Sequence, residues 1–323
     1  MNRMYKAAPM LVALAVAATT TAFAQEPAPG SWGKKAEMIE ANSEFATTEA
    51  GGKIYVLGGY PSTRESVKTV QVYDIATDTW TLGPPLPLVN NHGMAVTVDG
   101  IVYLIGGQTD PNLAYVDTVY ALDPKVGQWV QKAKMPVARS AGAPVVFEGR
   151  IYVAGGRPPH GSEFAVYDPK ADAWEKLPNL PTQRNHIIGA AMNGKIHVAG
   201  GRLLGGFQSN QVAVFEAYDP KTRAWSAAAP MLKPRSGHNG VIANGCLHVW
   251  GGEHKDGMHP DHDYYDPRSD KWTKLPDMAI PVHGVTGAAF VNGLIWVTGG
   301  GISKGGSSGT KLNQVYRPNV SCQ

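Results

Sequence analysis

The chain has 323 residues, of which 43% are hydrophobic and 17% are charged, so it holds ample apolar material for a folded core. Lysine and arginine together number 29 against 26 aspartates and glutamates, and this near balance disfavours a nucleic-acid partner. The 38 glycines and 24 prolines, with no amphipathic helical pattern, predict an all-β protein.

Residues 1–24 have the features of a signal peptide. Arg3 and Lys6 give a basic start, residues 10–18 form an apolar run, and Ala-Phe-Ala before residue 25 fits a cleavage site. The apolar run is too short for a stable membrane anchor, and no later segment is apolar enough to span a bilayer. We therefore predict an exported protein, periplasmic or secreted, with residues 25–323 as one domain. Cleavage lowers the formal net charge from +3 to +1, because two basic residues are lost.

A short motif recurs six times along the rest of the chain. Each copy has a tight turn, a strand of β-branched and aromatic residues, and a glycine pair that permits backbone angles other residues resist. The copies are GGKIYVLGG (Gly51–Gly59), DGIVYLIGG (Asp99–Gly107), GRIYVAGGR (Gly149–Arg157), NGKIHVAGG (Asn193–Gly201), NGCLHVWGG (Asn244–Gly252) and NGLIWVTGG (Asn292–Gly300). Successive glycine pairs are 45 to 51 residues apart, a period typical of repeat architectures.

A second mark keeps the same period. Five tryptophans each follow a tyrosine or leucine by seven residues, and four of these intervals open with Asp-Pro, a hairpin-turn signal. The tryptophans are Trp80, Trp129, Trp174, Trp225 and Trp272. The glycine pair, the Tyr-Asp-Pro and the spaced tryptophan together resemble the kelch repeat, over nearly all of the chain after residue 24. The resemblance implies a six-bladed β-propeller, with one four-stranded blade per repeat around a central channel.

The last repeat lacks its outer strand, since the chain ends at Gln323, seven residues after Tyr316. The segment Ser31–Met38 looks like the closing strand of a repeat, with Trp32 in the place of the outer-strand tryptophan. We predict that this N-terminal strand completes the sixth blade and so removes the open edge of the ring.

The kelch resemblance also implies a ligand face. In that family the first strand of each blade lines the channel, and the loops from strand two to three and from strand four to one share the face where ligands sit. Sixteen residues before the glycine pairs, where strand four turns into strand one, lie Asn42, Asn90, Arg139, Arg184, Arg235 and His283. Directly after the pairs, in the loops of variable length, lie Tyr60, Gln108, Arg157, Arg202, Glu253 and Gly301.

Five arginines at these positions predict a cationic sector. A guanidinium holds a carboxylate through two parallel hydrogen bonds, so the sector favours an anion such as an acidic sugar or an acidic peptide. The ligand-binding candidates are Asn90, Arg139, Arg157, Arg184, Arg202 and Arg235. The alternative is structural, because kelch repeats often carry an arginine before the first strand that bonds to neighbouring loops.

Four histidines are expected near the channel mouth. His92 and His186 share one repeat position, His238 is one residue out of phase, and His283 replaces the arginine. Histidine exchanges protons near neutral pH, so we name His186 and His238 as catalytic candidates and His92 and His283 as ligand-binding ones. The alternative is that each histidine bonds to a neighbouring blade.

Other conspicuous side chains need no function. His197 and His248 replace a strand tyrosine of the first three copies, and the tryptophans are interpreted as packing between blades. Cys246 and Cys322 either form a disulfide, which export permits, or remain one buried and one free thiol.

The loop Glu253–Asp263 holds three histidines and four carboxylates, residue types that bind divalent metals. Its Glu253, Asp256 and His259 are spaced by two intervening residues, whereas the iron site of some plant kelch proteins uses three. The copper chemistry of galactose oxidase needs a crosslinked Tyr–Cys pair, which this chain lacks. We interpret the loop as a solvated polar segment and predict no metal site and no cofactor.

Three functions remain open, because a fold alone decides none of them. The first is a sugar mutarotase or epimerase, similar to exported bacterial kelch proteins that interconvert sialic acid anomers. In it the arginines would hold the acid group of a carbohydrate and a histidine would move protons. The second is a non-catalytic module that recognises an acidic segment of a partner protein, and the third is a metal-dependent enzyme. In each case we expect a monomer with no nucleic-acid partner and no membrane span.

Overall fold

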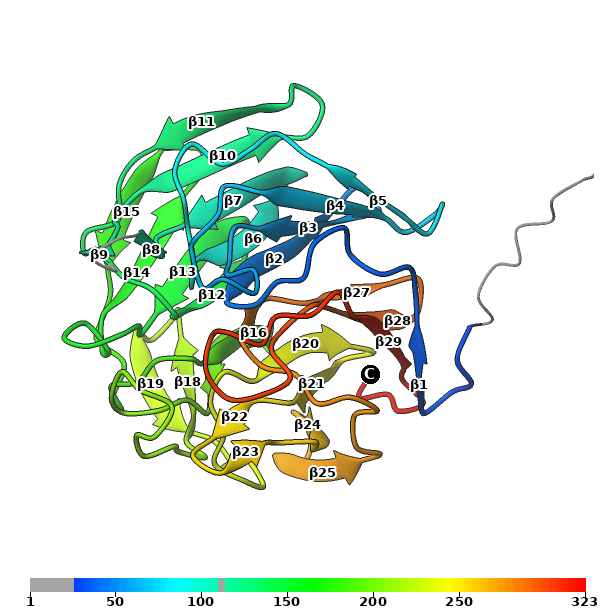
Figure 1. Cartoon of the computed structure of the whole chain (residues 1–323). Helices are drawn as coiled ribbons and strands as arrows, with labels where there is room; N and C mark the ends of the chain where they lie inside the picture. Colours follow the sequence, from blue (N-terminus) through cyan, green and yellow to red (C-terminus); the bar gives the residue numbers. More distant parts are fainter. Residues whose placement is uncertain (1–25, 110–113) are drawn as a thin grey trace, which may run out of the picture.

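Six blades, each with four antiparallel strands, stand around a central axis, and the sheet of one blade has a fifth, parallel strand (Figure 1). The computed structural model describes residues 26–109 and 114–323, and these contain no helix, hence none that could cross a membrane. The signal peptide predicted for residues 1–24 lies outside the described residues. The all-β, six-bladed propeller expected from the repeats is confirmed.

Each blade takes its strands from the axis outward. Blade one holds β2 (Phe45–Ala50), β3 (Lys53–Leu57), β4 (Val70–Asp74) and β5 (Thr79–Leu82). Blade two holds β6 (Met94–Val98), β7 (Ile101–Ile105), β10 (Val119–Asp123) and β11 (Gln128–Lys132). Blade three holds β12 (Ala143–Phe147), β13 (Arg150–Ala154), β14 (Phe164–Asp168) and β15 (Ala173–Lys176).

The second half of the ring repeats this order. Blade four holds β16 (Ile188–Met192), β17 (Lys195–Ala199), β18 (Phe215–Asp219) and β19 (Ala224–Ala227). Blade five holds β20 (Asn239–Ala243), β21 (Cys246–Trp250), β24 (His262–Asp266) and β25 (Lys271–Leu275). Blade six holds β27 (Ala289–Val291), β28 (Leu294–Thr298), β29 (Asn313–Arg317) and β1 (Ser31–Lys34). The remaining strands are β8 (Gln108–Thr109) with β9 (Ala114–Tyr115), β22 (Glu253–His254) with β23 (Gly257–Met258), and β26 (Val285–Thr286), which pairs with β2.

The turn that opens each repeated motif joins the first two strands of a blade. In blade four, Asn193 and Gly194 have φ of 48° and 73° between the paired residues Met192 and Lys195. Positive φ at both central residues defines a turn whose twist matches that of the flanking strands, and Asn-Gly is the sequence that adopts it most readily. The recurring Asn-Gly and related pairs therefore fix the strand register in each blade.

The outer-strand tryptophans join neighbouring blades, as the sequence predicts. Trp174 donates its Nε1–H to the carbonyl of Ala133 in the preceding blade, at 2.9 Å. The amide of Ala133 in turn donates to Asp172 at 2.8 Å, and Tyr167 donates to the same carboxylate oxygen at 2.5 Å. The equivalent bonds run from Trp80 to Ala36, from Trp129 to Pro84, from Trp225 to Pro178 and from Trp272 to Ala229. Apolar clusters fill the spaces between blades, so the core is distributed around the ring.

The N-terminal strand closes the ring. β1 pairs antiparallel with β29, and Trp32 lies opposite Tyr316 with ring centroids 5.0 Å apart. The first and the last strand of the described chain meet in blade six, where β1 lies beside β29 (Figure 1). The predicted closure is therefore confirmed.

A disulfide ties the C-terminal tail to blade five. Cys246 and Cys322 are bonded, with Cα atoms 5.1 Å apart, and the amide of Cys322 donates to the carbonyl of Asn244 at 2.8 Å. Of the two alternatives that the sequence leaves open for the cysteines, the structure has the bonded one.

Six left-handed residues, one per blade, form a closed ring of backbone hydrogen bonds around the axis. Each donates its N–H to the carbonyl of the corresponding residue in the preceding blade, at 2.5 to 3.1 Å. The ring residues are Glu44, His92, Ala141, His186, Gly237 and Gly284, with φ between 49° and 70°. The circle closes where Glu44 donates to Gly284, which joins blade one to blade six.

Removing the closing strand should destabilise the whole ring. A chain that begins at Ile39 lacks β1, so β29 becomes an open edge and Trp80 loses the carbonyl of Ala36. We expect the melting temperature to fall by about 5 °C or more, since each kcal/mol shifts a large domain by roughly 2–4 °C. Calorimetry against a chain that begins at Glu26 measures the effect, and equal melting temperatures would contradict the closure.

His248 should make stability sensitive to acid. Its ring is fully buried, with Nδ1 3.0 Å from Nε2 of the buried His262, and burial lowers the pKa of His248 from 6.5 to about 4. Below pH 6.5 His248 is protonated in the unfolded chain, whereas in the folded chain it becomes protonated only near pH 4. The free energy of unfolding therefore falls as pH falls through this window, by about 2 kcal/mol at pH 5 from this residue.

The variant His248→Tyr tests this prediction. Tyrosine occupies the corresponding strand position in the first three blades and does not titrate between pH 5 and 7. Urea midpoints at pH 7 and pH 5 should therefore differ less in His248→Tyr than in the wild type. His160→Gln, which changes a histidine of a surface loop, should keep the wild-type difference. Equal differences in the wild type and His248→Tyr would refute the assignment.

Candidate functional site

A cavity of about 240 Å³ opens on the axis, on the face that carries the loops from strand two to three and from strand four to one. Two of the ring residues, Glu44 and His92, form its floor. Residues that directly follow glycine pairs form its wall, namely Tyr60, Gln108, Arg157, Arg202 and Glu253. The long loop of blade four adds Phe207, and that of blade six adds Gly305.

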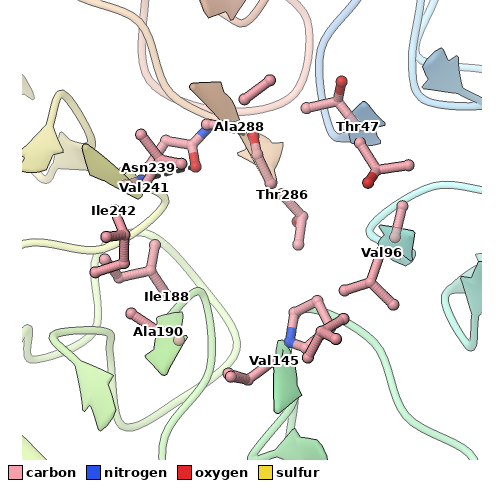
Figure 2. Close-up of a pocket in the computed structure, with 18 of the residues that line it drawn as sticks. Thr47, Val96, Val145, Ile188, Ala190, Asn239, Val241, Ile242, Thr286 and Ala288 are labelled. Carbon is pink, nitrogen blue, oxygen red and sulfur yellow. Dashed lines mark hydrogen bonds between the residues drawn. The ribbon is translucent and has the colours of Figure 1, made fainter. Parts of the chain in front are cut away.

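The channel lies on the other side of the hydrogen-bonded ring. It has a volume of about 480 Å³ and is lined by the inner strands of all six blades, with mostly small and apolar side chains such as Val96, Val145 and Ala190 (Figure 2). Between the channel and the cavity, the space beside Glu44 and His186 is only about 20 Å³. The ring therefore separates a cavity lined by charged side chains from a channel lined mostly by small and apolar ones.

Each glycine pair places the next side chain on the cavity wall. In blade four, Gly200 and Gly201 have φ of 63° and 105°, and the amide of Gly201 donates to Arg235 O at 2.8 Å. A Cβ at Gly201 would lie 2.3 Å from the Ile187 side chain, so only glycine fits. Beyond the turn, Arg202 exchanges two backbone hydrogen bonds with Asn185, both at 3.0 Å.

Two guanidinium groups meet at the cavity wall. Arg202 donates to Oε1 of Glu253 at 2.7 Å and to Nε2 of His186 at 2.7 Å. Arg157 donates from Nη1 to the carbonyl of Gly205 at 3.0 Å, and its Nη2 lies 2.9 Å from Nε2 of His92. Burial lowers the pKa of Arg157, and the neighbouring charge of Arg202 lowers it further.

Asparagines orient both ring histidines. Nδ1 of His186 lies 2.5 Å from the amide oxygen of Asn185, and Nδ1 of His92 lies 2.5 Å from that of Asn91. An amide oxygen only accepts, so both histidines carry a proton on Nδ1 and present Nε2 to the arginines. Burial lowers the pKa of His186 well below its usual range, and the charge of Arg202 adds to this effect.

His92 stands between an acid and a base. Its Nε2 is 2.9 Å from Arg157 Nη2 and 3.0 Å from Glu44 Oε2. Without a proton this nitrogen accepts from Arg157, and with one it donates to Glu44, so it cannot satisfy both neighbours at once. Burial lowers the pKa of His92, against the opposing charge of Glu44. The arrangement is suited to moving a proton.

Comparisons with known proteins identify the family. A family model described as the KLHDC2/KLHL20/DRC7 Kelch-repeats domain matches residues 35–201, just over half of the chain, and a Kelch motif model matches residues 189–232. The chain belongs to the kelch-repeat family.

The similar proteins match much of the chain. Kelch-like protein terF from Aspergillus terreus is 29% identical over 303 residues, which are 90% of this chain and 56% of that protein. Kelch-like protein 23 from Homo sapiens is 29% identical over 265 residues, 80% of this chain and 46% of that protein. This kelch chain thus spans about half the length of the curated relatives it matches. The solved structure of YjhT has a TM-score of 0.72 at 16% identity, covering 87% of this chain and 96% of that one, which shows the fold alone.

The residues sixteen before the glycine pairs are structural in this kelch propeller. Asn90, Arg139 and Arg184 each donate to the carbonyl of the first glycine of their own pair, at 2.8, 3.3 and 2.9 Å. Arg184 also donates to Glu216 at 2.5 Å, and Arg235 pairs with Asp263. The three arginines are 0–1% exposed, so no guanidinium edge is left for a ligand. The expectation that they clamp an acid group is therefore corrected.

Two histidine expectations also change. His238 is buried with its ring against Gly200, whose added Cβ would lie 2.6 Å from it, and it lines the narrow space beside Glu44 and His186 and not the cavity on the loop face. His283 does not occupy the arginine position. The residue of blade six that corresponds to Arg235 is Val282, because the carbonyl of each accepts from the second glycine of the preceding blade's pair. His283 instead pairs through its backbone with Gly301, as Asn185 pairs with Arg202. The inner strand of blade six is interrupted between β26 and β27, and the additional residue there shifts the count by one.

Sequence reasoning missed Glu44, which lies on the floor of the cavity. Its signal was available, because Glu44 occupies the repeat position of His92 and His186, two residues after Asn42. The polar side chains of the loop Glu253–Asp263 in blade five do not lie together, although the sequence predicts a single polar segment. Glu253 faces the axis, whereas His254 and His259 contact each other on the β22–β23 hairpin, with ring centroids 4.6 Å apart.

Arg184 should matter for folding. Arg184→Met keeps much of the volume but leaves the buried carboxylate of Glu216 and three carbonyls without their donor. Breaking a buried pair in this way costs about 3–5 kcal/mol. Arg157→Gln, at the cavity wall, should cost less than about 1 kcal/mol. Urea unfolding compares the two variants, and equal stabilities would overturn the distinction between structural and cavity arginines.

Proposed function

We propose that the axial cavity of this kelch propeller binds a small anionic molecule such as an acidic monosaccharide. The observation that carries the proposal is the state of Arg157. Among the residues that the structure describes, no carboxylate lies within 4.0 Å of its guanidinium, which contacts only a backbone carbonyl and histidine rings. A ligand carboxylate would supply the charge-assisted partner that this group lacks.

The charge of the cavity supports an anion. Its wall carries Arg64, Arg157 and Arg202 against Glu44 and Glu253, so the balance is positive with neutral histidines. The two inner guanidinium groups repel each other: burial is the main cause of the lowered pKa of Arg157, and the charge of Arg202 lowers that pKa further. A negative charge bound between them would relieve this repulsion.

The size and lining support a small polar ring. A volume of about 240 Å³ is below the usual range for drug-sized ligands, roughly 300–1,000 Å³. Phe207 offers an aromatic face, and Tyr60, Gln108 and Gln208 bring polar groups to the same wall. An apolar face beside several polar groups suits a monosaccharide.

The pair of His92 and Glu44 supports proton transfer on such a ligand. Mutarotation or epimerisation of a sugar needs an acid and a base in reach of the same centre, and this pair borders the cavity. His186 is less suited, since its two ring nitrogens already face Asn185 and Arg202. We therefore assign the acid–base role to His92 and Glu44 within a sugar isomerase function.

A second candidate is an acidic segment of a partner protein. Leu204 and Ile302 are 62% and 50% exposed on the loops that border the cavity. A neighbouring groove of about 700 Å³ shares Gln208 with the cavity wall and is lined by Pro181 and Leu204. A peptide could lie in this groove and direct one carboxylate to Arg157.

Export is also proposed for this chain. The disulfide between Cys246 and Cys322 supports it, because such bonds persist in the periplasm or outside the cell and are rare in the cytosol.

Binding of acidic sugars tests the proposed function. Calorimetric titration with glucuronate and with a sialic acid should show binding, whereas glucose, which lacks the carboxylate, should show little. Arg157→Gln should weaken binding of the acids by about tenfold or more, since a hydrogen bond to a charged group contributes roughly 1.5–3 kcal/mol.

The control is Arg150→Gln, which changes an arginine at the turn on the opposite face and should bind like the wild type. Equal binding of glucose and glucuronate would contradict the anion site. Binding of an acidic peptide with no response to either acidic sugar would favour the second candidate.

A further inference from the structure

Three buried side chains from three blades converge beside the cavity. Nδ1 of His283 lies 3.7 Å from Oε1 of Glu44 and 3.7 Å from Oε2 of Glu253. The three atoms all lie within 4.8 Å of one another, and each residue is at most 6% exposed. Both distances of 3.7 Å are too long for hydrogen bonds, so hydrogen bonding does not explain why the three side chains converge.

The tautomer of a neutral His283 is set by the partner of its Nε2. Nε2 lies 2.8 Å from the carbonyl of Ser303, and a carbonyl only accepts, so Nε2 carries the proton. Nδ1 is fully buried and has no hydrogen-bond partner. In the neutral ring, Nδ1 therefore directs a lone pair between two carboxylates. A metal-bound histidine typically has this arrangement, with its second nitrogen donating to a backbone carbonyl.

We propose that Glu44, Glu253 and His283 bind a divalent transition-metal ion. Bonds of about 2.1 Å to nitrogen and oxygen in a tetrahedral site place the ligand atoms about 3.4 Å apart. The two separations of 3.7 Å need only a small adjustment to reach this value. One imidazole and two carboxylates suit Zn²⁺, Mn²⁺ or Fe²⁺.

Contacts within the protein hold both carboxylates in place. Oε1 of Glu253 accepts from Arg202 at 2.7 Å, and its Oε2 also accepts from the amide of Gly305 at 2.7 Å. Oε2 of Glu44 faces His92 at 3.0 Å. Such outer contacts orient the ligands of a metal site. Because Glu44 and Glu253 line the cavity, the remaining coordination positions face it, as in sites that bind a substrate or water.

A neighbouring group of potential ligands is less suitable. Glu44, His92 and His186 also bring three ligand atoms together. However, Nε2 of His92 faces Arg157 and Nε2 of His186 faces Arg202, so a cation there would have to displace two guanidinium groups. The site at His283 needs no such displacement.

The sequence predicts no metal site, because the only candidate considered there is the loop Glu253–Asp263, which is interpreted as a solvated polar segment. The inference goes beyond the proposed function, since metal binding here requires no anionic ligand. It is tested on the whole protein with the metal alone, so it can fail while binding of acidic sugars succeeds, and the reverse.

Chelator-treated protein is titrated calorimetrically with Zn²⁺ and separately with Mn²⁺. We expect one ion per chain for at least one metal, and an affinity loss of at least 100-fold in Glu253→Gln and in His283→Gln. The control is the double variant His254→Gln/His259→Gln, which removes the two hairpin histidines and should keep wild-type affinity. Circular dichroism confirms the fold of each variant.

The visible spectrum of the wild type with Co²⁺ is a second test that needs no variant. A protein-bound spectrum that disappears when Zn²⁺ is added in equal amount supports the site. Absence of stoichiometric binding by the wild type overturns the proposal and leaves His283 as an imidazolium that bridges two carboxylates. Loss of binding in the His254→Gln/His259→Gln variant, with retention in His283→Gln, overturns it in favour of the hairpin.

Discussion

The ring of backbone hydrogen bonds around the axis is the constraint on which the site depends. Each blade contributes one left-handed residue, and four of the six are not glycine, although this conformation costs roughly 1–2 kcal/mol per residue. The inter-blade hydrogen bonds offset that cost. They also place the six side-chain positions in one ring around the axis. Three carry Glu44, His92 and His186, while Ala141 and two glycines leave space. At Gly284 a Cβ would lie 2.8 Å from the carboxyl carbon of Glu44, so the glycine makes room for the acid.

Arginines at two different repeat positions have opposite roles. Arg235 precedes the inner strand of blade five and turns into its own blade, where Asp263 and a carbonyl of Asp261 receive it. Arg202 follows a glycine pair and turns to the axis, where it meets Glu253 and His186. Full burial against an aspartate carboxylate and a backbone carbonyl makes the first kind part of the scaffold. The cavity arginines lie at the meeting point of several blades, where a ligand can complete their contacts.

The repeats made the fold predictable, and the same regularity misled the assignment of the site. The period of the glycine pairs and the spaced tryptophans carried the kelch resemblance, which implied six blades, and the incomplete last repeat indicated their closure by Trp32. Side-chain direction was not predictable, because the left-handed residue after each arginine breaks the alternation of a strand. A fixed count of sixteen residues also failed in blade six, where the inner strand has an additional residue and His283 takes the place of an asparagine. Glu44 could be recognised only by comparing ring positions across repeats.

The proposed anion and the proton on His92 are linked by geometry. Nε2 of His92 has Arg157 on one side and Glu44 on the other, and it can satisfy only one of them. An anion that draws the guanidinium of Arg157 toward itself would remove the donor and leave Glu44 as the neighbour, which favours the protonated imidazole. Binding would then prepare an acid beside the ligand without any movement of the ring. The narrow space beside Glu44 and His186 separates the cavity from the channel. Anion binding and the protonation of His92 would therefore both take place on the loop face.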